Sequence, residues 1–430
     1  MISYKVKSVL LVLAVCVSSS AHAFRAGATA GVNLEYTDNA ALDNTAEVDD
    51  VIATASLGVS ISEENGPVTG NADASVRWLD YLDNTFNEET YLRIGADAAW
   101  EQIRNRLIWR LDEQFSQRSL NTLAADTPSN TEDANAFRLS ADAIFQLADR
   151  HTLTISPSFS DFYYETSNND NQQLGMAAVW AYLLNQTTSL SLNGQFTDVD
   201  YDSDTLIANT SSDYERTNIS LGMAVNRLRS RYDATIGFTD VQRDMGAGLD
   251  GVTGSLTWVH NFTARSTITA HVSSDITDSS NTFLSSSINP DTGSIDNVQS
   301  SGDVLRDNKL RITYQREGAR VGASAWTELR DLNYSTAALD REVQEVGARI
   351  SYPLTALVTG IIGGSYTRTK DLVTPSTDKK FIVDGRLDYR LSRKLTANAG
   401  LRVRGKDSSV VNREYDELSI YAGVGYRFGN

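Results

Sequence analysis

Three histidines follow residue 23, and they are the chain's best candidates for acid–base or metal chemistry. His151 and His260 fall at predicted turns, and His271 falls within a predicted strand. The spacing of the histidines is not that of a zinc site. Ser273 and Asp275 share the face of His271, but side chains two residues apart on one strand point in parallel and do not converge on a reacting atom. We therefore predict no enzymatic activity, no metal site and no cofactor.

Basic side chains that recur on the polar faces of extended segments are the stronger functional feature. By alternation they would line the interior of a closed sheet. The basic residues are Arg77, Arg93, Arg110, Arg138, Arg231, Lys309, Arg311, Arg349, Arg386, Arg390, Arg402 and Arg404. The acidic residues on the same faces are Asp97, Asp112, Asp142, Asp233, Asp384 and Asp388. One interpretation is a wall of mutually paired charges. The other is a net basic lumen that concentrates anionic solutes or eases the passage of an acidic polymer.

These residues lie on about twenty segments in which apolar and polar residues alternate. In the last segment, for example, Leu418, Ile420 and Val424 share one face and Ser419, Gly423 and Arg427 share the other. The chain after residue 23 shows no helical periodicity and no run of about 20 apolar residues, which a membrane helix needs. Strands cross a membrane only as a closed barrel. We predict an all-β, transmembrane, antiparallel up-and-down barrel of about 20 strands, or 18 if the ambiguous pair over 174–196 is misread.

The connections between the segments alternate in length. Short turns such as 104–106 and 149–150 alternate with long links rich in Asp, Asn, Ser and Thr, such as 117–134 and 275–303. Outer-membrane barrels have short periplasmic turns and long outer loops. We therefore expect the outer membrane of a Gram-negative bacterium as the location, with both termini in the periplasm. The sequence leaves open whether 275–303 folds into the lumen.

Aromatic residues recur near the ends of the even-numbered segments and face outward by alternation. They are Trp100, Phe145, Trp258, Tyr314, Tyr352, Tyr389 and Tyr426. Aromatic side chains gather where a barrel meets the membrane–water interface. They predict a belt in contact with the outer-membrane lipid, and the acidic loops could bridge divalent ions to lipopolysaccharide.

The first 23 residues have the layout of a cleaved export signal. Lys5 and Lys7 precede the apolar run 9–17, and the small-residue site 21–23 follows. Cleavage would leave 24–430 as one barrel domain without Cys16, the chain's only cysteine. It would also leave 36 basic against 55 acidic side chains, which argues against nucleic acid as a partner. Because the first strand begins almost at residue 24, we expect no plug domain.

The stretch GVNLEYTDN at 31–39 and the closing YRF at 426–428 resemble the second β-barrel porin family, the BBP2-like outer-membrane barrels. The resemblance extends over essentially the whole chain after the export signal. It implies a link to the secretion of an exopolysaccharide or capsule, with an anionic polysaccharide and a periplasmic polysaccharide export protein as partners. Phe428 would be the terminal aromatic that the barrel insertion machinery reads.

Three functions remain open. The main hypothesis is a passive outer-membrane channel that serves the export of an extracellular polysaccharide. The first alternative is a general diffusion porin for small solutes. The second is a structural or surface-interaction barrel in which the loops act and the lumen stays closed.

Overall fold

The computed structural model describes residues 25–202, 213–244, 246–285, 299, 301–318 and 320–429. The predicted export signal, residues 1–23, lies outside this part of the chain. The described residues form twenty strands, the α-helix α2 (Ser279–Ser285) and the 3-10 helix η2 (Pro128–Asn130). The strands are β1 Arg25–Thr37, β2 Asp50–Glu63, β3 Val68–Tyr81, β4 Glu89–Ile103, β5 Leu107–Ser119, β6 Thr131–Ala148, β7 His151–Tyr164, β8 Asn171–Asn185, β9 Thr188–Tyr201, β10 Tyr214–Asn226, β11 Ser230–Arg243, β12 Leu249–Thr263, β13 Ser266–Asp278, β14 Val304–Glu317, β15 Gly322–Tyr334, β16 Arg341–Pro353, β17 Val358–Asp371, β18 Ser376–Arg390, β19 Leu395–Ser408 and β20 Tyr415–Phe428.

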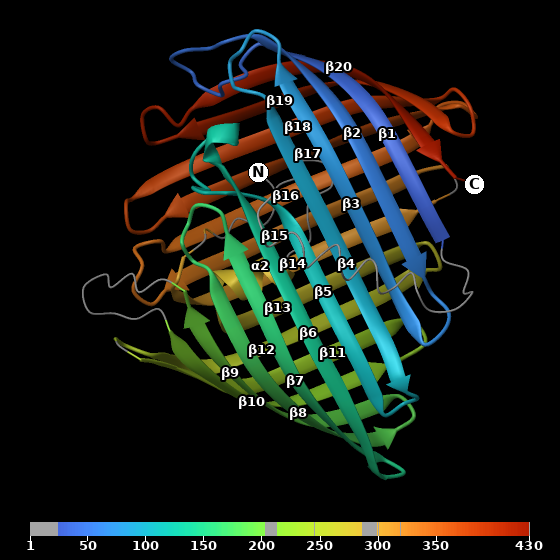
Figure 1. Cartoon of the computed structure of the whole chain (residues 1–430), viewed down its shortest axis with the longest axis vertical. Helices are drawn as coiled ribbons and strands as arrows, with labels where there is room; N and C mark the ends of the chain where they lie inside the picture. The colour runs from blue at the N-terminus through green and yellow to red at the C-terminus, as the bar shows by residue number, and fades with distance from the viewer. Residues whose placement is uncertain are drawn as a thin grey trace.

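The strands close into one antiparallel barrel (Figure 1). Each strand pairs with its neighbours in sequence, and β1 pairs with β20, from Ala28 opposite Phe428 to Thr37 opposite Ser419. The predicted all-β antiparallel barrel and its count of twenty strands are confirmed. The alternative of eighteen strands is wrong, because β8 and β9 are two complete strands that pair from Asn171–Tyr201 to Asn185–Thr188.

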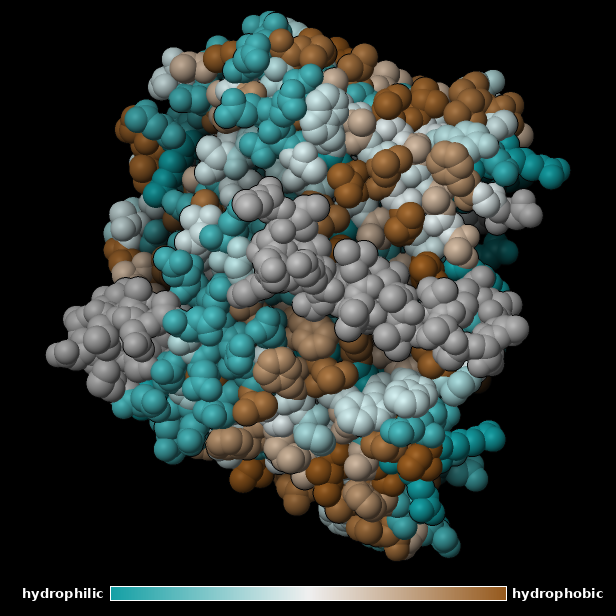
Figure 2. Space-filling view, viewed as in Figure 1, coloured by the Kyte–Doolittle hydropathy of each residue, from teal (hydrophilic) through white to brown (hydrophobic). Residues whose placement is uncertain are grey.

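The outer surface of the barrel is apolar because the strands alternate in side-chain direction. Leu34, Leu221 and Ile236 keep 57%, 61% and 63% of their surface exposed on this face. Brown apolar residues spread over the strands in the space-filling view, and teal polar residues gather at its left edge (Figure 2). So much exposed apolar surface marks an interface with a partner or a membrane, and a lipid-facing barrel wall accounts for it.

The two ends of the barrel differ as the sequence indicates. Even-numbered strands are followed by turns of two to four residues, and odd-numbered strands by longer connections, except that the link 372–375 after β17 also has four residues. In the turn 104–106, Asn105 adopts φ 55°, a left-handed conformation that asparagine tolerates. Because β1 starts and β20 ends at the short-turn end, both ends of the described chain lie there. That this end faces the periplasm stays a prediction.

The densest packing of side chains lies inside the mouth at the long-loop end. Phe162 and Tyr164 pack there against Phe283, and a second cluster contains Tyr214 and Ile276. The first of these clusters forms because α2, which follows β13, folds inward and lies within the barrel outline (Figure 1). The sequence left open whether the link 275–303 folds into the lumen, and the described helix of this link does so. With seven residues, α2 is too short to show helical periodicity in sequence.

Among the described residues, no helix has the length and hydropathy to cross a membrane.

Candidate functional site in the barrel lumen

A buried hydrogen-bond network fixes the start of α2 inside the barrel. The carboxylate of Asp278, the last residue of β13, accepts a hydrogen bond from the Tyr214 hydroxyl. It also accepts one from the Asn281 backbone N–H at 2.6 Å and one from the Gln173 amide at 3.3 Å. The Ser280 hydroxyl, which is fully buried, accepts a bond from the Tyr164 hydroxyl at 2.9 Å. The partners come from β7, β8 and β10, so the helix is tied to several wall strands.

Apolar contacts hold the other side of α2. Phe283 is 2% exposed and packs against Ala134, Ala136 and Phe162 on β6 and β7. The Arg118 guanidinium lies 5.6 Å from the Phe283 ring, within the range of a cation–π contact. The helix therefore reaches from β13 to β6 and β7 and narrows the lumen.

A small polar cavity of about 240 Å³ lies beside the end of α2. Leu284 forms part of it, and Asp73, Arg93, Asp97 and Asp112 line it from β3, β4 and β5. These wall residues lie near the middle of their strands, so α2 extends well below the mouth.

Asp303 holds the end of the connection that leads from α2 back to β14. Its carboxylate accepts hydrogen bonds from the Arg243 guanidinium and from the Ser335 hydroxyl at 2.7 Å. The backbone N–H groups of Thr336 and Ala337 donate to it at 2.8 and 2.7 Å. Burial raises the pKa of the Asp303 carboxyl, but these donors outweigh burial and hold its pKa below the usual value. The carboxylate therefore stays ionised and anchored at neutral pH.

A second segment, the connection 120–130 between β5 and β6, crosses the mouth from another side. Three of its acceptor groups contact cations on the far wall. The Thr122 hydroxyl accepts from Arg341 of β16, and the Leu123 carbonyl accepts from Lys406 of β19. The Asp126 carboxylate accepts from Lys380 of β18. We call residues 120–130 the inward loop.

The inward loop has internal bonds that keep it compact. The Asn130 side-chain amide donates to the carbonyls of Asn121 at 2.9 Å and of Ala125 at 3.0 Å. Its side-chain oxygen accepts from the Asn121 N–H at 2.9 Å. The loop can therefore act as one body that rests on the far wall through the three contacts with cations.

The far wall offers a cluster of cations, Lys380, Arg404 and Lys406, to this loop. Lys380 lies directly opposite Lys406 in the pairing of β18 with β19. Lys406 also contacts Asp378 at 3.0 Å, and Arg404 is held by Glu417 at 2.9 Å. We call Lys380, Arg404 and Lys406 the cation cluster.

Asp126 lies within the field of this cluster but remains in contact with water. Its side chain keeps 39% of its surface accessible. Burial raises the pKa of the Asp126 carboxyl, but the Lys380 ammonium beside it, with Arg404 and Lys406, more than offsets burial and holds its pKa below the usual value. The contact therefore depends on an ionised carboxylate.

Most basic residues predicted for the lumen have an acidic neighbour on the wall. The pairs are Arg110–Asp142 at 2.7 Å, Arg231–Asp233 at 2.6 Å, Arg311–Glu328 at 2.8 Å, Lys309–Glu328 at 3.6 Å, Arg386–Asp388 at 3.0 Å, Arg402–Glu35 at 3.3 Å, Arg402–Asp384 at 3.9 Å and Arg404–Glu417 at 2.9 Å. The lumen wall is therefore rich in paired charges.

The other predicted basic residues have different surroundings. Arg138 donates to Asn281 of α2 at 2.9 Å, and Arg77 lies 5.9 Å from the Tyr91 ring. Arg93 lines the small polar cavity. In the strand register, Arg349 lies opposite Gly363, and Arg390 lies opposite Thr396.

Sequence reasoning missed Arg341, Lys380 and Lys406 among the basic residues, and it missed the role of Asp126. Lys380 has the same parity as Asp384 and Arg386 on β18. Extending the alternation back to the first residues of this strand would therefore have placed Lys380 on the inner face. Nothing in the sequence around Asp126 could show that its loop folds inward.

Residues 306–428 match the family model described as "Putative beta-barrel porin 2". The match confirms the resemblance to this porin family over β14–β20, which includes the closing YRF. The matched region contains the cation cluster and Arg341, whereas the inward loop and α2 lie outside it. None of the curated proteins matches the chain.

Several solved structures resemble the whole barrel at low sequence identity. The siderophore receptor PirA from Acinetobacter baumannii has a TM-score of 0.52 and 8% identity, with 95% of this chain and 81% of that chain covered. PirA from Pseudomonas aeruginosa has a TM-score of 0.46 and 12% identity, with 96% and 81% covered. OccK2 (OpdF) from Pseudomonas aeruginosa, in complex with glucuronate, has a TM-score of 0.40 and 9% identity, with 94% and 98% covered. The first of these supports the assignment of the barrel fold.

The predicted belt residues lie near the short-turn ends of their strands. In the matched stretch 306–428, Tyr352 and Tyr389 are each one residue from a strand end and are exposed. Tyr426 packs against Phe428 with ring centroids 4.7 Å apart. Trp100 and Phe145 are exposed on β4 and β6, and Trp258 and Tyr314 are half-buried on β12 and β14. The belt's contact with lipid stays a prediction.

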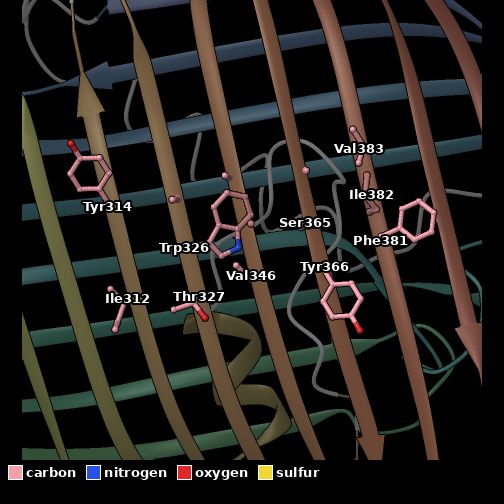
Figure 3. A pocket seen from close by; sticks show the side chains of 14 residues that line it. Ile312, Tyr314, Trp326, Thr327, Val346, Ser365, Tyr366, Phe381, Ile382 and Val383 are labelled. Carbon is pink, nitrogen blue, oxygen red and sulfur yellow. The ribbon is translucent and has the colours of Figure 1, made fainter.

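The matched stretch 306–428 also has an apolar groove of about 660 Å³ in its outer wall over β14–β18. Tyr314, Tyr366 and Phe381 frame it in the close view (Figure 3). Its lining includes the small residues Ala348 and Gly364, which face each other in the register of β16 and β17. This groove lies on the outer face and has no part in the lumen site.

In the described part of the chain, no group of three or more His, Cys, Asp or Glu side chains is arranged to hold a metal ion.

Proposed function

We propose that the protein is an outer-membrane channel whose lumen selects anionic solutes. The observation that carries this proposal is the cation cluster, which lies on the inner face of β18 and β19 and takes up a carboxylate from the inward loop. A cation on a lumen wall attracts anions and repels cations, and such charges set selectivity in barrel pores. The match to a porin family supports a channel as the general class.

The solute that we propose is an acidic polysaccharide on its way out of the cell. The resemblance to the porin family suggests this cargo, and a barrel of twenty strands is in the size range where wall side chains leave an open interior. A periplasmic polysaccharide export protein would then meet the short-turn end. The inward loop and α2 would restrict the mouth to a single extended chain.

A test of the channel is the reversal potential of the refolded protein in a planar bilayer under a salt gradient. An anion-selective channel shifts this potential toward the equilibrium potential of chloride. A cation-selective channel of the same size would contradict the proposal. Deleting the genes for polysaccharide synthesis or export should produce the same secretion defect as deleting this barrel, if the cargo is assigned correctly.

A closed structural barrel is the second candidate, because α2 and the inward loop both cross the mouth. In that case the purified protein would conduct no ions, and a variant with a shortened inward loop would conduct none either. Conductance that appears or rises when 121–127 is replaced by a short glycine-containing turn would instead favour a channel that this loop restricts.

A further inference from the structure

The inward loop contacts the far wall through a particular set of acceptor atoms. Asp126 contributes a carboxylate, Thr122 a hydroxyl and Leu123 a carbonyl, and each accepts from a basic side chain. These contacts join residues far apart in sequence, since 254 positions separate Lys380 from Asp126. One carboxylate with neighbouring hydroxyl and carbonyl oxygens is also the acceptor set that an acidic sugar offers.

The cation cluster requires an anion between its members. Lys380 and Lys406 are direct cross-strand partners, and like charges in that position destabilise a sheet. On the wall, Asp378 contacts Lys406 at 3.0 Å and Glu417 holds Arg404. Lys380 receives its carboxylate from Asp126, which lies on a loop and not on the barrel wall. The Asp126 carboxylate is therefore the one anion of this cluster that can move away from the wall, because it belongs to the loop.

The contact of Asp126 with Lys380 is also open to exchange with solvent. The two side chains keep 39% and 30% of their surface accessible, whereas Lys406 keeps 6%. Because both partners keep contact with water, a competing anion can reach them and replace one of the two. At Lys380 the described wall therefore presents a cation that a dissolved carboxylate can reach.

We propose that the cross-strand partners Lys380 and Lys406 form a binding site for the carboxylate and a neighbouring oxygen of an acidic sugar unit, which the Asp126 carboxylate and the Leu123 carbonyl occupy until such a unit displaces them. This inference rests on the proposed anion channel and assigns the residues that would bind its acidic solute. Binding of the sugar acid to the wall releases the inward loop, so that the solute itself opens the mouth.

The test measures equilibrium binding of glucuronate to the folded barrel in detergent at pH 7, by calorimetric titration. Glucose is the neutral counterpart, since it has the ring and hydroxyl groups but no carboxylate. Asp126→Asn removes the charge of the internal competitor and keeps its shape. We expect this variant to bind glucuronate at least about tenfold more tightly than the natural protein, and to bind glucose no better.

Lys380→Gln removes the wall cation and should weaken glucuronate binding by about tenfold or more. Lys379→Gln is the matched control, because residue 379 is adjacent in sequence but has the opposite parity on β18 and faces away from the lumen. It should bind as the natural protein does. If Lys380→Gln does not fold, the gain in Asp126→Asn still tests the site.

Equal affinity of the natural protein, Asp126→Asn and Lys380→Gln would overturn the proposal, as would binding of glucose as tight as that of glucuronate. Absence of glucuronate binding by Asp126→Asn would overturn it too. The outcome is separate from that of the channel proposal, because binding is measured without conductance. Binding without any conductance would leave the sugar-acid site standing and contradict the channel, and conductance without binding would do the reverse.

Discussion

The two segments that cross the mouth of the barrel are held in different ways. Helix α2 is fixed by buried groups, since Asp278 and Ser280 are fully buried and Phe283 is 2% exposed. The inward loop rests on the far wall through contacts with cations, and its Asp126 side chain keeps 39% of its surface accessible. Stranding buried polar groups costs far more free energy than breaking an accessible ion pair. We infer that α2 sets a permanent constriction, whereas the inward loop can move aside.

Cysteine accessibility compares the two segments directly and should show the largest difference. In a background with Cys16→Ala, Ser280→Cys places a thiol in the buried site of α2, and Ser129→Cys places one on the exposed side of the inward loop. A water-soluble thiol reagent should modify residue 280 at least about a hundredfold more slowly, because it must wait for local opening. Equal rates would remove the distinction between the segments.

Breaking the anchor of α2 should have the next largest effect. Asp278→Ala leaves the Tyr214 hydroxyl and the Gln173 amide without their buried acceptor. We expect the free energy of unfolding to fall by about 1–3 kcal/mol for each stranded group, and the single-channel conductance to rise. Both are measurable on refolded protein, by urea titration and in planar bilayers.

Asp275→Ala is the control for this change. Asp275 is on the same strand and pairs with Arg216 at 3.1 Å, but its side chain is 48% exposed. Its loss should cost about 1 kcal/mol or less. A cost as large as that of Asp278→Ala would mean that burial does not distinguish the two carboxylates.

Acidification should loosen the inward loop. Because the pKa of Asp126 is lowered in the docked loop, docking is favoured above the ordinary carboxyl pKa of 3.8 and is lost as the pH falls through the lower, docked value. Conductance should therefore rise in a window below pH 3.8. Asp126→Asn should lack this component, and a rise of the same size in that variant would assign it to other carboxylates.

Reversing one lumen charge outside both segments should have the smallest effect. Arg402 contacts Glu35 at 3.3 Å and Asp384 at 3.9 Å, so part of its charge is already balanced on the wall. Arg402→Glu should shift the reversal potential toward cation selectivity without a change in the unitary conductance. Lys370→Glu, at a position that faces outward by parity on β17, should leave the potential unchanged.

The sequence predicted the barrel wall well because a strand's alternation records which side faces water. The strands and their closure into one antiparallel wall follow from this one pattern. The mouth could not be predicted in the same way. Helix α2 and the Asp126 contact depend on where loops fold in space. These segments are too short to show a periodic pattern of apolar residues that would predict their position.

The sequence also could not predict which acidic side chain each basic side chain of the lumen contacts. Arg386 and Asp384 share the inner face of β18, yet Arg386 contacts Asp388 at 3.0 Å and Asp384 lies near Arg402 of β19 at 3.9 Å. Alternation places a side chain on a face, whereas the strand register and rotamer decide its partner. The partner therefore had to come from the structure.

Conductance of the refolded protein in a planar bilayer, before and after addition of an acidic polysaccharide, tests the central claim most directly. An anion channel that passes such a polymer should show discrete, anion-selective steps that the polymer blocks and that a neutral polysaccharide of the same length does not. Cation-selective steps, or steps that the acidic polymer leaves unchanged, would contradict it.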